Sequence, residues 1–385
     1  MPVVCQDPMS RPALITCLAL VVALTAWPAQ EKKKKKKHKQ DEEPITQVLE
    51  LPKDPPAAVV ADADRLLFQV SPLSGKGLLS QQLREALKWV LRQDRTVVRL
   101  RAFVAGTGDT RRVQSIVSEA FSEKHLSLPV LTVVQIGALP LEGAQVLLEA
   151  VLSDKKPSNP NGLAFLSGQG GYVGEPLKPV MPFVEKATGR LQAALKAASI
   201  EPGEVLRVGC YITSLEEADK VRSTIAMQFP RASVSVVQPL RAALQSGASC
   251  DAVARLSSPP GGPLKFINPP DLEHAAHSSA VALVAPGKIA LSGAQLAFGA
   301  TDADARLAFE RLGKSLEQVT ASYDHVAVAE VYSLSRAASE EARKVAAGFF
   351  AKGGPPAVTA LPFEGLPSMD ASFAIDVIVL LSESK

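Results

Sequence analysis

The sequence predicts an α/β (α+β) fold made of three tandem domains. Each domain is expected to have the element order β-α-β-α-β-β, with its helices on one face of a mixed sheet. Two observations carry this prediction: an internal repeat that aligns without a gap in three places, and proline-rich breaks that cut the chain into pieces of similar length. Helix patterns alternate with strand patterns inside each piece, which is typical of a sheet covered by a layer of helices.

The repeat is clearest in three windows of 25 residues. Each window opens with a strand pattern that ends near an aromatic residue, passes through a polar turn and continues into an amphipathic helix. In the first window Val113, Ile116 and Val117 are spaced for one helix face. The windows are Val97–Phe121, Val205–Phe229 and Val326–Phe350.

A strand and a helix are predicted before each window, and two strands after it. The preceding pairs are Arg65–Val70 with Gln81–Leu91, Leu163–Ser167 with Pro182–Ala198, and Lys288–Ser292 with Ala303–Ala321. The following pairs are Val130–Ile136 with Ala144–Leu152, Ala232–Gln238 with Ala248–Leu256, and Ala357–Phe363 with Ser372–Leu381. The glycine-rich stretch 168–174 lacks the Lys-Ser/Thr of a phosphate-binding loop and is predicted to be a turn.

Composition divides the chain into six parts. A signal peptide is expected at 1–29 and a lysine-rich linker at 30–56, followed by domains at 57–156 and 157–256, a Pro/Gly linker at 257–276 and a third domain at 277–385. The run Lys32–Lys37 has no hydrophobic period, and a block of like charges stays solvated. Two interpretations of this run stay open, a flexible spacer and a contact with an anionic envelope surface.

The first residues predict export to the periplasm or the medium. Arg11 precedes the uncharged run Ala13–Ala26, and Ala26 and Ala29 are small residues at which cleavage is expected. Either Met1 or Met9 serves as a start in this interpretation. The lysines after the run oppose translocation, so an uncleaved membrane anchor is the alternative.

The rest of the chain excludes several classes of function. Residues 44–385 carry 34 positive and 34 negative side chains, so a nucleic-acid partner is not expected. No spacing of Cys and His is typical of a metal site, and no cofactor motif is present. Cys210 and Cys250 remain once the signal is removed, and both a disulfide between them and two separate thiols stay open.

Several short stretches together resemble the RidA/YjgF family. Ser167-Gly168-Gln169 in the second domain and Ser292-Gly293 in the third resemble its strand end Ser-Gly-Gln. The turns Leu139-Pro140 and Leu366-Pro367 are similar to its Leu-Pro turn, and an acidic residue stands in each last strand, namely Glu149, Asp251 and Asp376. The resemblance covers residues 59–381 apart from the linkers.

The resemblance implies a trimer of β-α-β-α-β-β domains with ligand sites in the clefts between subunits, where many members hydrolyse enamines and imines. Three linked copies are then expected to close as one pseudo-trimer within a monomer, because a tether makes the association intramolecular. The residues carried over as binding residues are Ser167, Gly168, Gln169, Ser292 and Gly293.

The family's catalytic groups are mostly missing. The arginine of its Pro-Ala-Arg-Ser stretch, which clamps a substrate carboxylate, is replaced by Leu131 in the first domain and by Val358 in the third, while Arg231 is the candidate in the second. The first of two acids in the last strand maps to Leu147, Ser249 and Ala374. His277 stands near the place of an aromatic hydroxyl and is the candidate base.

The sequence therefore predicts a degenerate RidA-like protein that binds a small metabolite or a partner in its inter-domain clefts. The alternative is an imine/enamine deaminase with a single active cleft that uses Arg231 and His277. A ribonuclease and a structural protein of the cell envelope are the remaining alternatives.

Overall fold

The computed structural model describes residues 53–106, 109–299 and 301–381. The predicted signal peptide (1–29) and all but the last four residues of the predicted linker (30–56) lie outside the described residues. In the described part of the chain, no helix has both the length and the apolar composition needed to cross a membrane. Below, "first segment" means residues 57–156, "second segment" 157–256 and "third segment" 277–385.

The first segment forms a four-stranded sheet in the order β2-β5-β3-β4. Strand β3 runs parallel to β4 and antiparallel to β5, so the sheet is mixed. Two helices cover one face, where Leu83, Val117 and Phe121 are buried against the strands. The elements are β2 (Leu66–Val70), α1 (Leu79–Leu91), β3 (Thr96–Ala105), α2 (Arg111–Ser122), β4 (Val130–Ile136) and β5 (Val146–Ser153).

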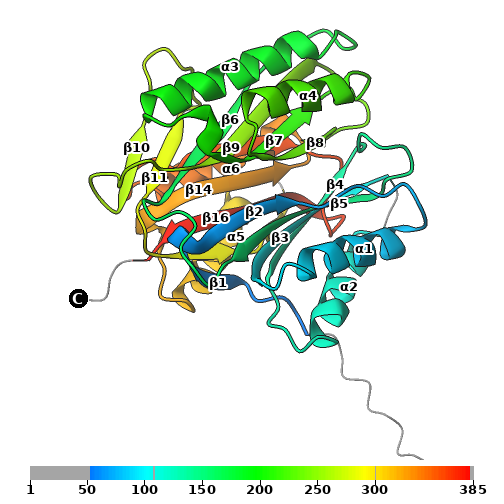
Figure 1. Ribbon diagram of the computed structural model, residues 1–385, viewed down its shortest axis with the longest axis horizontal. Helices are drawn as coiled ribbons and strands as arrows, with labels where there is room; N and C mark the ends of the chain where they lie inside the picture. Colours follow the sequence, from blue (N-terminus) through cyan, green and yellow to red (C-terminus); the bar gives the residue numbers. More distant parts are fainter. Residues whose placement is uncertain (1–52, 107–108, 300, 382–385) are drawn as a thin grey trace, which may run out of the picture. The chain divides into compact units, whose positions relative to one another are not determined.

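The second segment supplies four strands of a sheet with the order β10-β11-β6-β9-β7-β8. Figure 1 shows α3 and α4 side by side over this sheet, and Cys210 and Cys250, which face each other on neighbouring strands, form a disulfide. The segment's elements are β6 (Leu163–Val173), α3 (Met181–Ala197), β7 (Val205–Ile212), α4 (Ala218–Gln228), β8 (Ser233–Val237) and β9 (Ser246–Arg255).

The third segment supplies most of a sheet with the order β1-β12-β16-β14-β15, in which β13 also pairs with β16. Helices α5 and α6 cover one face through Phe309, Leu312 and Val345. The segment's elements are β11 (Val281–Val284), β12 (Lys288–Ser292), β13 (Gln295–Phe298), α5 (Asp302–Glu317), β14 (Val326–Ser333), α6 (Arg336–Phe349), β15 (Ala357–Pro362) and β16 (Ala371–Leu380).

The α/β class with mixed sheets is confirmed, and each segment contains the predicted order of strands and helices. The sequence did not predict that strands from one part of the chain would pair into a sheet built mainly by another segment. Strand β1 (Ala58–Asp62) pairs antiparallel with β12, and β11 pairs antiparallel with β6 and with β10 (Leu264–Ile267). Each therefore extends a sheet built mainly by another segment, and β10 lies inside the stretch that was predicted to be a linker.

The glycine-rich stretch after Ser167 is strand rather than the predicted turn. Strand β6 continues to Val173, with a register shift between Leu166 and Gln169, and pairs along β9. A Cβ atom at Gly170 would overlap the carbonyl oxygen of Ala248. The glycines therefore let two backbones approach closely, which is a recognised use of glycine within strands.

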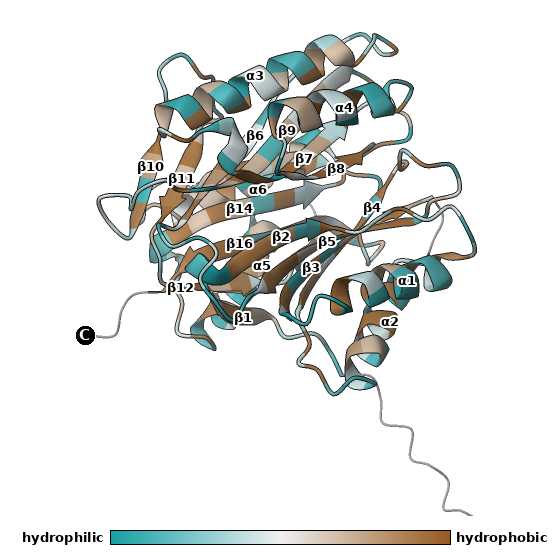
Figure 2. Cartoon of the chain, viewed as in Figure 1, coloured by the Kyte–Doolittle hydropathy of each residue, from teal (hydrophilic) through white to brown (hydrophobic). Residues whose placement is uncertain are grey.

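The faces of the sheets without helices pack against one another in layers. Along β14, Val328, Glu330 and Tyr332 point to one side because side chains alternate along a strand. Val328 belongs to an apolar cluster with Phe165, and Tyr332 belongs to a second cluster with Phe103. Figure 2 shows hydrophobic residues along β2, β14 and β16, whereas hydrophilic and hydrophobic residues alternate along α1 and α3.

The outer edge of β2 is closed by the second segment. The side chain of Asn159, which is 1% exposed, donates through Nδ2 to the carbonyl oxygen of Leu66 at 2.7 Å. The hydroxyl of Ser233 donates to the carbonyl oxygen of Phe68 at 3.0 Å. Two carbonyl groups that a further strand would otherwise satisfy are thus hydrogen-bonded to side chains.

We expect Asn159→Ala to lower the free energy of unfolding by about 1–3 kcal/mol, because it leaves the buried carbonyl of Leu66 unsatisfied. Asn161→Ala is the matched control, since Asn161 is only partly buried and makes a solvent-exposed hydrogen bond to the carbonyl oxygen of Ser257. Urea denaturation of both variants measures the difference. Equal losses would contradict a structural role for Asn159 at this edge.

Candidate functional site

The Ser-Gly stretch of the third segment lies against the first segment. The amide of Gly293 donates to the carbonyl oxygen of Ala57 at 2.9 Å. A Cβ atom at Gly293 would lie 3.2 Å from the carbonyl oxygen of Leu131 on β4. Leu131, which the sequence analysis placed at the position of the family's arginine, is therefore next to the Ser-Gly stretch of a different segment.

The Ser-Gly stretch of the second segment lies against the third. The amide of Gly168 donates to Oγ1 of Thr359 on β15 at 3.0 Å. A Cβ atom at Gly168 would meet the side chains of Thr359 and Ser249 at 3.2 and 3.1 Å. The contact between Gly168 and Thr359 lies at the same place in the repeat as the contact between Gly293 and Leu131.

The register of the parallel strands identifies which residue of each segment is equivalent to Leu131. Val130 on β4 pairs with Arg99, and Ala357 on β15 pairs with Val328. In the second segment the residue paired at the same point of the repeat is Ser233, opposite Arg207. The next residue in each strand is Leu131, Val358 and Val234, so the position is aliphatic in all three segments.

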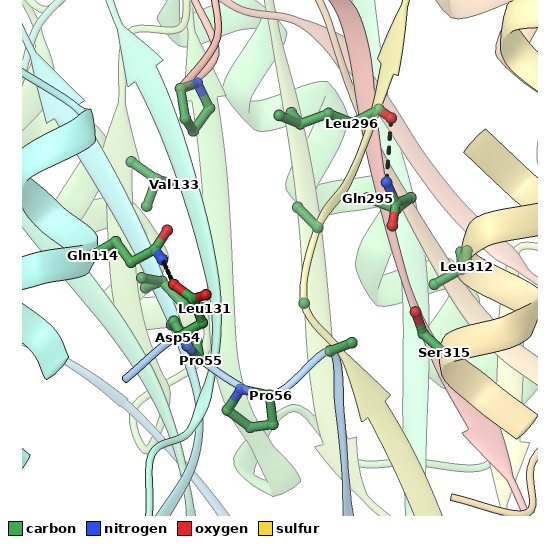
Figure 3. A pocket seen from close by; sticks show the side chains of 14 residues that line it. Asp54, Pro55, Pro56, Gln114, Leu131, Val133, Gln295, Leu296, Leu312 and Ser315 are labelled. Atoms are coloured by element: carbon green, nitrogen blue, oxygen red, sulfur yellow. Dashed lines mark hydrogen bonds between the residues drawn. The ribbon is translucent and has the colours of Figure 1, made fainter. Parts of the chain in front are cut away.

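The neighbourhood of Leu131 and Gly293 contains an open cleft of about 230 Å³. Figure 3 shows Leu131 and Val133 on one wall and Leu312 and Ser315 of α5 on the other. The volume suits a small ligand of a few heavy atoms rather than a drug-sized molecule. The walls come from the first and third segments together, so the cleft exists only when both are folded.

Among the described residues that line this cleft, Asp54 is the one charged residue, and Gln114, Gln295 and Ser315 are polar. Its carboxylate accepts a hydrogen bond from Nε2 of Gln114 at 2.7 Å (Figure 3). The side-chain amide of Gln295 donates weakly to the carbonyl oxygen of Leu296 at 3.4 Å. The hydroxyl of Ser315 donates to the backbone carbonyl oxygen of Arg311 at 3.0 Å. The described residues that line the cleft include no cationic side chain that could pair with a carboxylate.

The other residues predicted for the site are spread over the molecule. The side chain of Arg231 is 64% exposed, lies 3.8 Å from Glu204 and lines none of the cavities described here. His277 is exposed and adopts a left-handed backbone with φ of 58°. His277 lines a small cavity of about 10 Å³ that Arg231 does not line, so none of these cavities is lined by both residues.

The serine and glutamine side chains of the predicted binding set are buried and make contacts within the protein. Oγ of Ser292, which is fully buried, accepts from the amide of Val377 at 2.9 Å. Nε2 of Gln169 donates to Oγ of Ser167 at 3.0 Å, and both side chains are buried. The Ser292 contact joins β12 to β16, whereas the bond between Gln169 and Ser167 lies within β6, and Oε1 of Gln169 has no hydrogen-bond partner in the described part of the chain.

A cluster of buried charges lies between the apolar layers of the sheets and was not predicted. Arg99 pairs with Glu330 and, at 2.7 Å, with Asp376, which joins the first segment to the third. Arg101 pairs with Glu149 of its own segment and with Glu330 at 2.8 Å. These contacts connect β3 with β14 and β16 through fully desolvated ion pairs.

The second segment joins the cluster through Arg207. Its guanidinium lies 2.9 Å from Glu149 of the first segment and 2.7 Å from Asp251 of its own. A Cβ atom at Gly209 would overlap this guanidinium, so the glycine makes room for it. Ser235 adds a hydrogen bond to Glu149, and Thr132 donates to Asp376 at 2.8 Å.

The cluster holds three guanidinium groups and four carboxylates, so it balances when one carboxylate carries a proton. Burial, opposed by Arg99 and reinforced by Glu330, raises the pKa of Asp376 to about 7. Burial also raises the pKa of Asp251, whose Oδ2 accepts no hydrogen bond in the described part of the chain. Although burial alone would raise the pKa of Glu149, Arg101 and Arg207 lower it to about 2.

The cluster is a structural feature rather than a reactive site. Its cavity of about 50 Å³ leaves room for little more than water, and each arginine is held by carboxylates. The sequence signal for it was partly visible, because Glu149, Asp251 and Asp376 recur in the last strands. Among the described residues, no group of three or more His, Cys, Asp or Glu side chains could hold a metal ion.

Comparisons with known proteins give weak likenesses. No family model and no curated protein sequence matches the chain. A member of the YjgF/YER057c/UK114 family from Mycobacterium tuberculosis is 20% identical over 31% of this chain and 99% of its own, with a TM-score of 0.23. The Rid-family protein YyfB from Yersinia pestis, of unknown function, is 17% identical over 31% of this chain and 100% of its own, with a TM-score of 0.28.

RidA from an Antarctic Psychrobacter is 19% identical over 24% of this chain and 80% of its own, with a TM-score of 0.23. Likenesses of this strength do not establish membership of a family, and they assign no activity to this chain.

We expect the free energy of unfolding to fall as the pH rises from about 5 to about 8, by roughly 2–3 kcal/mol more in the wild type than in Asp376→Asn. The folded protein binds a proton on Asp376 at pH values where the unfolded chain, with a pKa near 3.8, does not. Stability from this group is therefore present at the lower pH and is lost as the pH passes about 7. Denaturant titrations at several pH values measure this slope.

Asp370→Asn is the control for that measurement, because Asp370 is exposed just before the same strand. It should keep the wild-type slope. If Asp376→Asn also keeps that slope, the shared proton does not reside on Asp376.

Proposed function

We propose that this protein is a RidA-like domain array that has lost imine chemistry and binds a small uncharged ligand in the cleft between its first and third segments. The observation that carries the proposal is the aliphatic residue at the arginine position of all three segments, Leu131, Val234 and Val358. A carboxylate substrate needs a cation at that point. The open cleft beside Leu131 offers neutral hydrogen-bonding groups in its place.

The cleft has the character of a binding site without a reaction centre. Its lining is slightly more apolar than polar, and a few polar side chains set among apolar ones are usual in small-molecule sites. A general base would have to lie within hydrogen-bonding reach of a bound water. Asp54 is the one charged residue among the described residues that line the cleft, and its carboxylate is exposed and accepts a hydrogen bond from Gln114.

Closure of the three segments into a pseudo-trimer is part of the same proposal. Contacts between different pairs of segments support it: Leu131 with Gly293, Thr359 with Gly168, and Ser233 with Phe68. Each contact brings the start of a parallel strand of one segment to the first strand of another. Export to the periplasm or medium remains an expectation from residues 1–29.

We expect that the purified protein does not accelerate the hydrolysis of 2-iminopropanoate to ammonia and pyruvate above the rate in buffer. The physical reason is that no described cavity combines a guanidinium with a carboxylate free to orient water. Coupled detection of ammonia released from the imine generated in situ measures this. An acceleration that disappears in Arg231→Ala would instead support the deaminase alternative.

We expect the cleft to bind benzamide more tightly than benzoate. In Leu131→Arg we expect benzoate to bind about tenfold more tightly than benzamide, because the new guanidinium forms charge-assisted hydrogen bonds with the carboxylate. Ligand-detected NMR measures both affinities. Leu126→Arg is the control, since Leu126 is exposed on the loop before β4 and does not line the cleft. A reversal in the control as well would show that the binding is non-specific, and no binding of benzamide would contradict the proposal.

A further inference from the structure

A second cavity, with a volume of about 480 Å³, lies between the second and third segments. It shares no lining residue with the cleft beside Leu131. Its walls are formed by the end of β7, the loop 239–245, the end of β15 and the residues between β14 and α6. This volume lies within the usual range for small-molecule sites.

The walls of this cavity are mostly apolar and are formed by well-packed parts of the fold. Tyr211 and Leu361 are buried at its base and belong to the aromatic cluster between the sheets. The ring of Tyr172 lies against Gly247, where a Cβ atom would overlap it. The floor is thus preformed, which reduces the entropy that a ligand must overcome on binding.

The rim of the cavity exposes more apolar surface than an isolated surface residue would. Leu244 is 85% exposed, Tyr172 is 41% exposed and Leu334 is 38% exposed. Grouped exposed apolar side chains around a cavity are typical of binding surfaces. An apolar ligand body placed here would remove all three from water.

One charged side chain, Arg336, lines the cavity. Its guanidinium donates to Oε1 of Gln245 on the opposite wall at 2.9 Å. Among the described residues no carboxylate lies within ion-pair distance of it, in contrast to the arginines of the buried cluster. Arg336 is also the first residue of α6, whose first turn has no acidic residue, so the positive potential at this end of the helix is not neutralised.

We propose that this cavity binds a small molecule with an aromatic or branched aliphatic body and a single carboxylate head. The body packs on Tyr172 and Leu361, and the carboxylate accepts two hydrogen bonds from the guanidinium of Arg336. One cation balances one negative charge. A doubly charged phosphate would leave an uncompensated charge beside apolar walls, which is unfavourable.

Isothermal titration of the full-length protein with 4-phenylbutanoate and with 4-phenylbutanamide tests the proposal, because the two probes share a body and differ in charge. The acid is expected to bind at least about tenfold more tightly than the amide. Arg336→Gln should remove this difference by weakening the acid alone. Arg111→Gln is the matched control, since Arg111 begins α2 as Arg336 begins α6 and lies outside the cavity.

Two further variants separate this cavity from the cleft of the proposed function. Ala243→Trp fills the second cavity and should abolish binding of both probes, whereas Leu131→Trp fills the cleft and should leave both affinities unchanged. Loss of binding in Leu131→Trp would place the probes in the cleft and overturn the inference while supporting the proposed function. Equal affinity for acid and amide, undiminished acid binding in Arg336→Gln, or no binding of the acid below about 10 mM would also overturn it. The acid–amide comparison and Arg336→Gln decide the matter even if Ala243→Trp folds poorly.

Discussion

A guanidinium group can be buried away from water only where carboxylates surround it, and three such groups lie where the helix-free faces of the sheets meet. Arg99 and Arg101 tie the first segment to Glu330 of the third, and Arg207 ties the second segment to Glu149 of the first. Breaking one of these pairs would leave a buried charge without a partner, which is strongly destabilising. The way the three sheets pack against one another therefore depends on the pairing of these arginines with carboxylates of other segments.

The same cluster explains why the segments are not equivalent. The repeat has Arg99 and Arg207 at one position, but the third segment has Val328 there. The third and second segments consequently have no ion pair corresponding to that of Arg207 with Glu149, and the hydrogen bond from Gly168 to Thr359 lies between them. Gly168 and Thr359 are thus in direct contact at this position, whereas the cleft beside Leu131 is open.

Local patterns predicted the fold class and the order of elements well, because helix and strand periods are properties of short stretches. Strands β1, β10 and β11 were missed because their partners lie in sheets built by other segments, and no local pattern encodes that pairing. Arg231 was assigned to the arginine position from sequence order alone, whereas the pairing of Ser233 with Arg207 makes Val234 the residue equivalent to Leu131 within the repeat. The sequence around the arginines of the cluster did not indicate which acidic residues, far away along the chain, pair with them.

The pairing of β1 with β12 has a consequence for the order of events during synthesis. Ala58 emerges from the ribosome long before its partner Ser292 is synthesised. Strand β1 therefore stays unpaired during the synthesis of all the residues that form the other two sheets. The last sheet is therefore complete only when both ends of the described chain are available. Bringing them together carries the entropy of closing a very long loop, and a nascent chain that stops early keeps an exposed strand at its beginning.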